Sequence, residues 1–498
     1  MNWWKTPKSF PVRIFLVALV LRLVPVIAMR QIGIGLDDMF QYDMLARSLV
    51  AGNGYRWYAQ GDLKLIQPVL NLDLSSGYDP RGVLTSFRPP LYPAFLALIY
   101  FVAGVGPKRF FIARLVQTLL AASMAPLTYA LALRFFPDRR RVAVIAAWVI
   151  CLYPLLVLYP LSLATENLFF VLTLCTVLAL LKAEESLAAP KTTEKPKPPF
   201  LATIHRARWF LLAGLLLGLT ALTRSVSLVF AGLAVLWVGF MLRRWKMATV
   251  VFAMVALVTL PWIVRNSLLH HRLVGIESAL GYDLYLGYHP AGTGTFQYPQ
   301  SLDLMRMLDD GLRDQVGRAR AWEFIKADPG RFPYLVIRRA GYFFGLERRA
   351  LTYFYSNNFF GYLPTPLLLA IAALVLLPFV FVSISAGFGL AIVRWRKETS
   401  LLALFLFGYI TPHLLIISED RFHLTIVPFL AILAVFCWTS GWPAFKARWP
   451  TRGGKIAILL AVLATVLLFS NWGLELWRDA GKLAQLLGSS GNTTFFPY

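Results

Sequence analysis

The chain has 498 residues, of which 58% are hydrophobic and only 15% are charged, and its mean hydropathy is +0.62. This balance excludes a soluble globular protein of such length and indicates a polytopic membrane protein. The net charge of +24 falls largely in short basic clusters between apolar runs, which is typical of cytoplasmic loops and not of nucleic-acid binding. The three cysteines lie within apolar runs and form neither a disulfide framework nor a metal-binding motif.

The first predicted membrane span covers residues 10–30, and no small-residue cleavage site follows it. Ten further spans are predicted at about 110–135, 142–160, 167–182, 209–223, 225–242, 248–265, 365–391, 400–417, 424–440 and 457–472. Alternating these spans across the bilayer places every basic cluster on the cytoplasmic side. The fold class predicted is therefore an all-α polytopic membrane protein with about eleven spans, its N-terminus inside and its C-terminus outside.

The apolar stretch 88–104 is not counted as a span, because doing so would place the triple arginine 139–141 outside and reverse all later loops. Its roughly 16 apolar positions would form about 24 Å of helix, and three prolines crowd its start. We expect a re-entrant or interfacial helix on the outer side, with a spanning helix as the alternative.

The predicted topology divides the chain into six regions. These are the first span in 1–30, an outer loop at 31–109, spans two to seven in 110–265 with a Pro- and Lys-rich cytoplasmic linker at 183–208, a second outer loop at 266–364, spans eight to eleven in 365–472, and an outer tail at 473–498. In the second outer loop, Asp303 and the pair Asp328-Pro329 mark the limits of a predicted amphipathic helix.

Acids and arginines from distant segments meet on the predicted outer side. The acids are Asp37, Asp38 and Glu166, and the arginines are Arg88, Arg224, Arg265 and Arg421. Ionisable groups at a membrane boundary need a partner or a polar cavity, so they are candidates for function. A carboxylate can act as a general base, and arginines can bind a phosphate bidentately.

Each of these residues also has a purely structural interpretation. The aspartate pair can cap the helix that begins near Met39, and Glu166 can be the first acid of a span. The arginines can be anchors to lipid headgroups, and Arg421 can pair with the neighbouring acids Glu419 and Asp420. The aromatic stretch around Tyr285 and His289 can line the path of an acceptor or form a packed outer layer.

A series of motifs resembles the GT-C-fold glycosyltransferases, closest to the branch of protein O-mannosyltransferases and the lipid A aminoarabinose transferase. The stretch D-x-x-x-Y-x-x-x-A-x-x-L-x-x-G-x-G-Y, from Asp38 through Tyr42 to Tyr55, is similar to the first outer loop of that family. RPPLYP, LSLATENLF, ALTRS, PWIVRN and EDRFHLTIVPFLAILA follow in the family's order. The resemblance covers roughly residues 10–435.

The resemblance implies inverting transfer of a sugar from a polyprenyl-phosphate carrier to a lipid, glycan or protein acceptor. The reaction would take place on the outer face of the inner or plasma membrane, with no cofactor and usually no metal. Asp38 matches the family's proposed general base, Arg88 the residue that contacts the carrier phosphate, Glu166 a second acid and Arg421 a late basic residue. Tyr42 becomes a further candidate through its place in the motif.

The sequence departs from the family pattern at two of these motifs. Phe422 replaces the tyrosine that often follows the late arginine, and ALTRS replaces a common Lys-Pro. Asp37 stays an alternative to Asp38 as the base. The competing function classes are a transporter or flippase of lipid-linked sugars and a non-catalytic partner in glycan assembly; the sequence specifies neither the sugar nor the acceptor.

Overall fold

The computed structural model describes residues 9–70, 72, 74, 78–187, 199–348, 351 and 362–488. The first basic cluster, residues 188–198 of the predicted cytoplasmic linker and the end of the outer tail therefore lie outside the described residues. Within the described ranges the chain is mainly helical. The strands found there are the short antiparallel pair β1 (Arg56–Trp57) and β2 (Val83–Leu84).

Eight of the described helices are long and apolar enough to cross a membrane. They are α1 (Phe10–Ala28), α5 (Arg109–Phe135), α8 (Glu166–Glu185), α11 (Trp245–Leu269), α17 (Thr365–Ile392), α18 (Lys397–Leu415), α19 (Val427–Arg448) and α20 (Arg452–Arg478). A ninth span is possible if α6 (Arg140–Leu152) is joined to α7 (Pro154–Leu158) and η1 (Tyr159–Leu161) across a bend of 56°. The protein is thus a multi-pass membrane protein.

The two remaining predicted spans are shorter apolar helices. One is α9 (Pro199–Thr223), of which Ala207–Thr223 forms a shorter apolar helix. The other consists of η2 (Ser225–Ser227), α10 (Leu228–Leu236) and η3 (Trp237–Met241), in which a 3-10 turn and a π-helical turn flank the α-helix. The predicted number of eleven spans is therefore not confirmed and stays a prediction.

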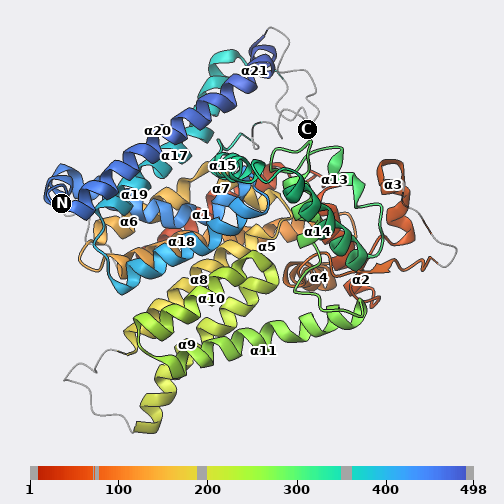
Figure 1. Cartoon of the computed structure of the whole chain (residues 1–498), viewed down its shortest axis with the longest axis horizontal. Coiled ribbons are helices and arrows are strands. Elements are labelled where there is room, and N and C mark those ends of the chain that lie inside the picture. Colours follow the sequence, from red (N-terminus) through yellow and green to blue (C-terminus); the bar gives the residue numbers. More distant parts are fainter. Residues whose placement is uncertain are drawn as a thin grey trace.

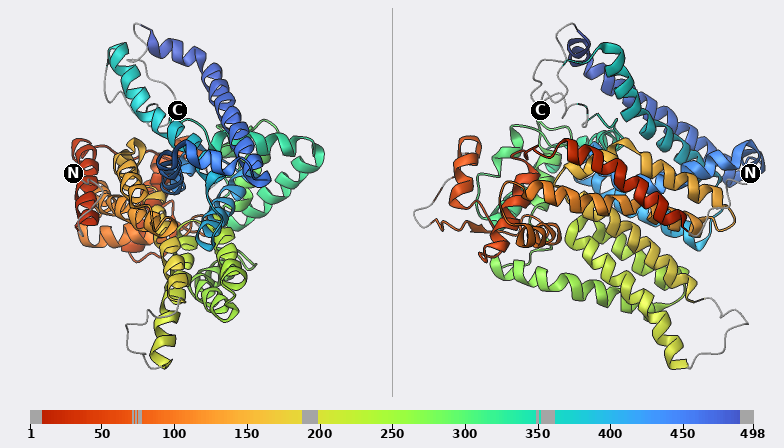
Figure 2. Two further views of the ribbon diagram at one scale, coloured as in Figure 1. Left: turned by 90° about the vertical axis from the view of Figure 1, so that its left-hand side faces the viewer. Right: turned by 180° about the vertical axis from the view of Figure 1, so that it is seen from behind.

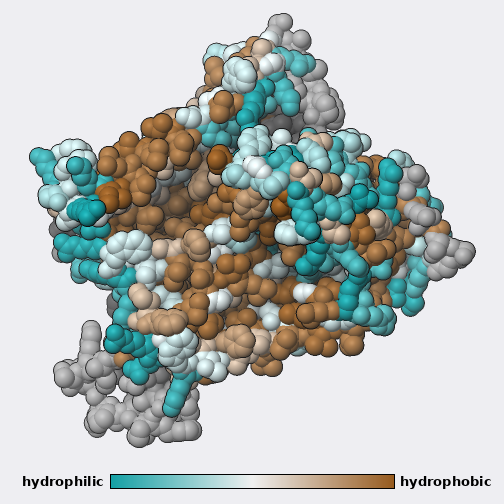
Figure 3. Space-filling view, viewed as in Figure 1, coloured by the Kyte–Doolittle hydropathy of each residue, from teal (hydrophilic) through white to brown (hydrophobic). Residues whose placement is uncertain are grey.

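The helices connecting the spans gather at one end of the bundle. Figure 1 shows α2 (Asp38–Val50), α3 (Gln60–Leu70), α4 (Leu91–Ala103), α13 (Gln300–Asp303) and α14 (Asp310–Ala327) together on the right, and Figure 2 shows the same grouping from behind. In Figure 3, hydrophobic residues cover the middle of the visible face between hydrophilic residues at the two ends. α4, with 13 residues, is about 20 Å long and too short to span a bilayer alone.

Two long connections lie between spans: the first joins α1 to α5, and the second joins α11 to α17. The second connection also contains α12 (Leu280–Tyr288) and α15 (Arg331–Phe343). The short helices η4 (Asp420–Thr425) and α21 (Ala480–Leu487) lie later in the chain. The amphipathic helix expected from Asp303 is broken. α14 begins only after Asp309, whose carboxylate accepts hydrogen bonds from the backbone N–H groups of Gly311 and Leu312. It ends at Ala327, as the Asp-Pro pair indicates.

A hydrophobic core joins the two long connections to each other. Phe40, Trp57 and Phe87 from the first connection pack in one cluster with Tyr282 and Leu286 from the second. The edge of the Phe87 ring meets the Tyr282 ring at a centroid distance of 5.5 Å. Because these buried side chains hold the two segments together, polar residues on both are brought to one place.

Candidate active site

A cavity of about 370 Å³ lies where α2, the segment before α4, the start of α8, the turn after α9, the start of α12, α18 and η4 meet. Its wall contains four carboxylates, those of Asp38, Glu166, Glu277 and Asp283. It also contains four arginines, Arg88, Arg224, Arg318 and Arg421. The rest of the wall is mainly apolar and includes Leu228 and Val229 of α10 and Ile416 just after α18.

The two adjacent aspartates have different surroundings. Asp37 is the N-cap of α2, and its carboxylate accepts a hydrogen bond from the backbone N–H of Met39 at 2.9 Å. Burial and the neighbouring charge of Asp38 raise the pKa of Asp37. Asp38 stands in the first turn of the helix and faces the cavity. One aspartate suffices as the cap, so the second is free for another role.

Asp38 lies between two arginines. Its Oδ1 pairs with Nη2 of Arg88, and its Oδ2 lies 2.9 Å from Nη2 of Arg421. Burial alone would raise the pKa of Asp38, but the charges of Arg88 and Arg421 and the hydrogen bond from Arg421 hold it well below its usual range. In this arrangement Asp38 is a stable carboxylate and a weak base.

The ion pairs continue from Arg421 across the cavity wall. Nε of Arg421 lies 2.9 Å from Oε2 of Glu419 and 4.0 Å from Oε1 of Glu166. The same Glu166 oxygen lies 2.6 Å from Nη1 of Arg224. Glu166 is only 2% exposed, and a charge so deeply buried needs such a partner. Three arginines from three separate segments are thereby fixed at one cavity.

Arg88 is held on several sides. Its Nε donates a hydrogen bond of 2.8 Å to Oε1 of Gln41, and its guanidinium lies 5.5 Å from the ring centre of Tyr42. The carbonyl of Arg88 accepts a hydrogen bond of 2.9 Å from the hydroxyl of Tyr55. Tyr42 itself lines the cavity, as expected for a residue at the site.

Four candidates from the sequence lie outside the residues that line this cavity: Asp37, the helix cap, together with Arg265, Tyr285 and His289. Arg265 donates from Nη1 to the carbonyl of Thr85 at 2.6 Å. Tyr285 donates its hydroxyl hydrogen to Asp303 at 2.9 Å, and its ring packs against that of His289 at 5.1 Å. Tyr285 and His289 thus pack against each other outside this cavity, and their role on the path of an acceptor stays a prediction.

Glu277, Asp283 and Arg318 line the cavity although the sequence did not single them out. Glu277 accepts a short hydrogen bond from the hydroxyl of Ser225, and burial raises its pKa. Nε of Arg318 pairs with Asp314 at 2.9 Å. The signal for Asp283 was an acid inside the aromatic and apolar stretch GYDLYLGY.

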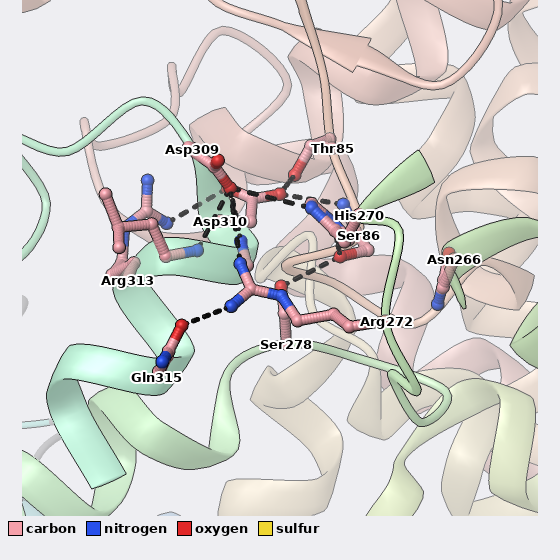
Figure 4. A network of polar contacts seen from close by, with 12 residues as sticks. Thr85, Ser86, Asn266, His270, Arg272, Ser278, Asp309, Asp310, Arg313 and Gln315 are labelled. Carbon is pink, nitrogen blue, oxygen red and sulfur yellow. Dashed lines mark hydrogen bonds and ion pairs between the residues drawn. The ribbon is translucent and has the colours of Figure 1, made fainter. Parts of the chain in front are cut away.

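A buried polar network beside the cavity fixes the segment that leads to Arg88 (Figure 4). The carboxylate of Asp310 accepts hydrogen bonds from the Thr85 hydroxyl and, at 2.7 Å, from the backbone N–H of Ser86. The backbone N–H of Ser278 donates to the Ser86 carbonyl at 2.9 Å. Because Ser278 follows Glu277, this contact joins the two parts of the chain that supply Arg88 and Glu277 to the cavity wall.

The same network contains a serine, a histidine and an aspartate in sequence. The Ser86 hydroxyl lies 2.7 Å from Nε2 of His270, whose Nδ1 lies 3.6 Å from Asp309. Ser86 is 0% exposed, bonds also to Ser278 at 2.9 Å, and does not line the cavity. A nucleophile must reach its substrate, so this group is structural. Among the described residues, no group of three or more His, Cys, Asp or Glu is arranged to hold a metal ion.

This chain is similar to known proteins in its structure. No family model matches the sequence, and no curated protein does. The oligosaccharyltransferase of Archaeoglobus fulgidus in the apo form matches with a TM-score of 0.51 at 14% identity, covering 100% of this chain and 61% of its own. The same enzyme tethered to an acceptor peptide with an NVT sequon also matches with a TM-score of 0.51, at 14% identity, covering 100% of this chain and 60% of its own.

ArnT of Cupriavidus metallidurans bound to undecaprenyl phosphate has a TM-score of 0.39 and 14% identity, covering 89% of this chain and 80% of its own. The chain spans about three fifths of the length of the archaeal oligosaccharyltransferase. The likeness to that enzyme confirms the predicted fold class, the GT-C fold of membrane glycosyltransferases. At this identity the likeness is one of fold.

Proposed function

We propose that the protein is a membrane glycosyltransferase that moves a sugar from a polyprenyl-phosphate-linked donor to an acceptor, with inversion at the anomeric carbon. The observation that carries this proposal is the composition of the cavity wall. Arg88, Arg224 and Arg421 meet there beside apolar residues of α10 and α18. Such a wall suits a ligand with a phosphate at one end and an isoprenoid chain at the other.

The arginines supply the chemistry of the leaving group. A planar guanidinium donates two parallel hydrogen bonds to a phosphate, and its charge stays fixed at all working pH values. As the bond between the anomeric carbon and the phosphate oxygen breaks, negative charge grows on the phosphate. Fixed cations in a partly dehydrated cavity stabilise that charge. The predicted phosphate contact of Arg88 belongs to this proposal together with those of Arg224 and Arg421.

Asp38 holds Arg88 and Arg421 in place through one oxygen each. Its role as the general base stays a prediction. A donor phosphate that binds the same arginines would weaken their hold on the carboxylate and raise its pKa. Glu166 fixes Arg224 in the same manner.

We place the reaction on the outer, periplasmic face of the inner membrane. α8 begins at the cavity with Glu166 and has 20 residues, which gives about 30 Å and matches the hydrocarbon thickness. Near its other end, Glu185 pairs with Arg134 at 2.9 Å. Arg244 and Lys397 line a second pocket together with Arg134 and Glu185. Basic residues concentrate on the cytoplasmic side, so the cavity faces outward.

The test uses purified protein in proteoliposomes with a panel of radiolabelled undecaprenyl-phosphate-linked hexoses and pentoses. A membrane extract serves as the source of acceptor. We expect label from one donor to move to an acceptor with wild-type protein and not with Asp38→Asn or Glu166→Gln. Movement of intact lipid-linked sugar between leaflets without transfer would identify a flippase instead. Neither transfer nor movement with any donor would contradict both functions.

A further inference from the structure

The four carboxylates of the cavity wall differ in what they bind. Both oxygens of Asp38 are paired with arginines. Glu166 is paired with Arg224 and lies near Arg421. Glu277 accepts the hydroxyl hydrogen of Ser225. In the described part of the chain, Asp283 has no hydrogen bond or ion pair at its carboxylate, although it lines the same cavity.

Asp283 has a fixed position on that wall. It stands in the first turn of α12, between Tyr282 and Leu284. Tyr282 packs in the hydrophobic core that joins the two long connections, and Leu284 packs against a smaller cluster within the second connection. The backbone N–H of Gly281 donates to Asp314 of α14 at 2.6 Å. An alanine at Gly281 would place its Cβ 2.0 Å from the carbonyl oxygen of Asp314, so α12 and α14 are in close backbone contact. The carboxylate is therefore presented by a rigid element.

We propose that Asp283 is a catalytic residue that accepts the proton of the acceptor nucleophile, while Asp38 positions the arginines that bind the donor phosphate. This inference rests on the proposed function and adds the proton-accepting group to it. A general base needs an unengaged lone pair within reach of the nucleophile. Of the four carboxylates, Asp283 is the one with no hydrogen bond or ion pair at either oxygen within the described part of the chain, whereas Glu277 has one oxygen bound to Ser225.

The step balances without a cofactor. The hydroxyl or amine of the acceptor forms a bond to the anomeric carbon of the sugar and gives its proton to an Asp283 oxygen. The bond between that carbon and the phosphate oxygen breaks, and its electron pair stays on the phosphate. Arg88, Arg224 and Arg421 stabilise the added negative charge. Asp283 later returns the proton to water through the open cavity.

The charges around Asp283 suit this role. Burial and the negative charge of Glu277 raise the pKa of Asp283 to about 8, against the opposite effects of Arg88 and Arg224. Asp38 adds a second negative charge, and Arg318 of α14, which also lines the cavity, is paired with Asp314. A base whose pKa is close to the working pH removes a proton better than one held strongly acidic by two arginines. Because only the ionised carboxylate of Asp283 can accept a proton, the active fraction of the protein grows as the pH rises through about 8.

The experiment measures the single-turnover rate of transfer between pH 6 and pH 9 in proteoliposomes. The probe is the undecaprenyl-phosphate hexose or pentose that gives wild-type transfer, with membrane extract in excess. We expect the wild-type rate to rise with pH and level off above about 8. Asp283→Asn, which keeps the shape of the side chain, should be slower by roughly 10²–10⁴-fold and lose this pH dependence.

Two comparisons separate catalysis from structure. Asp283→Ala should regain part of its rate with added formate, which enters the vacated space and accepts the proton. Glu323→Gln, at an exposed position of α14, removes the same charge outside the cavity and should leave rate and pH profile unchanged. Retention of undecaprenyl phosphate, measured by filter binding, should stay unchanged in Asp283→Asn, because Asp283 does not hold the phosphate.

The outcomes of the two proposals are distinct. If wild-type protein transfers label but Asp283→Asn keeps the wild-type pH profile, the assignment of Asp283 is wrong and the glycosyltransferase function stands. The same holds if Asp38→Asn, and not Asp283→Asn, removes the pH dependence. If wild-type protein transfers no label from any donor, the proposed function itself fails.

Discussion

Replacement of Arg88 by alanine tests how the cavity binds phosphate. In the free protein its guanidinium bonds to Gln41 and Asp38 and lies over the rings of Tyr42 and Phe87. In the donor complex we expect these donors to turn partly to phosphate oxygens. A hydrogen bond to a charged group contributes about 1.5–3 kcal/mol. Losing one should therefore raise the donor KM by roughly 10- to 150-fold.

The assay varies the concentration of the labelled undecaprenyl-phosphate sugar at a fixed excess of membrane extract. Arg88→Lys keeps the charge but loses the planar fork, so its donor KM should fall between wild type and Arg88→Ala. Arg81→Ala is the matched control, because Arg81 is an exposed arginine of the same connection that pairs with Asp79. An unchanged donor KM in Arg88→Ala, with the protein folded, would refute phosphate binding and leave Arg88 as a lipid anchor.

Further predictions follow from the same contacts. Asp37→Ala removes a helix cap, so the free energy of unfolding should fall by about 1 kcal/mol while transfer continues. Arg265→Ala should raise the donor KM less than Arg88→Ala, because its guanidinium binds the Thr85 carbonyl outside the cavity. Asp310→Ala leaves the fully buried Arg313 without its ion pair and should cost about 3–5 kcal/mol in a detergent unfolding series. Asp38→Asn should lose transfer yet retain more undecaprenyl phosphate than wild type in filter binding.

Hydrophobic length was sufficient to predict most of the helices of the bundle, because a long apolar run has few alternatives to a membrane helix. α8 begins at Glu166, one residue from the predicted start. The region of α9, α10 and their turns was harder to predict. A 3-10 turn and a π-helical turn interrupt regular α-helix there, and neither has a distinct hydrophobic pattern. Hydropathy alone therefore does not decide whether these segments span.

For the candidate site, the predicted topology indicates which residues lie near one another but not where their side chains point. Asp38, Arg88, Glu166, Arg224 and Arg421 come from five segments and line one cavity, because alternating spans bring their ends to one side. Position at a helix end does not specify the direction of a side chain. Arg265 therefore points to a backbone carbonyl.

The acids of the second long connection illustrate the limit most clearly. Asp283 reaches the cavity only because α12 packs on α14 and both pack on the first connection. Those contacts link residues far apart in the sequence and depend on how a long segment folds. One sequence contains no periodic signal for such contacts.

The carboxylate of Asp38 competes with the donor phosphate for the same two arginines, Arg88 and Arg421. The carboxylate already occupies one guanidinium donor of Arg88 and one of Arg421, so an incoming phosphate must share or displace it. Two negative charges about 6 Å apart repel by about 3 kcal/mol at an effective dielectric constant of 20. The amide of Asp38→Asn accepts a hydrogen bond but carries no charge, so the phosphate should bind more tightly. The same substitution frees the arginines from the carboxylate that orients them, and transfer should be lost. Weaker phosphate binding in this variant would show that orientation of the arginines outweighs competition for them.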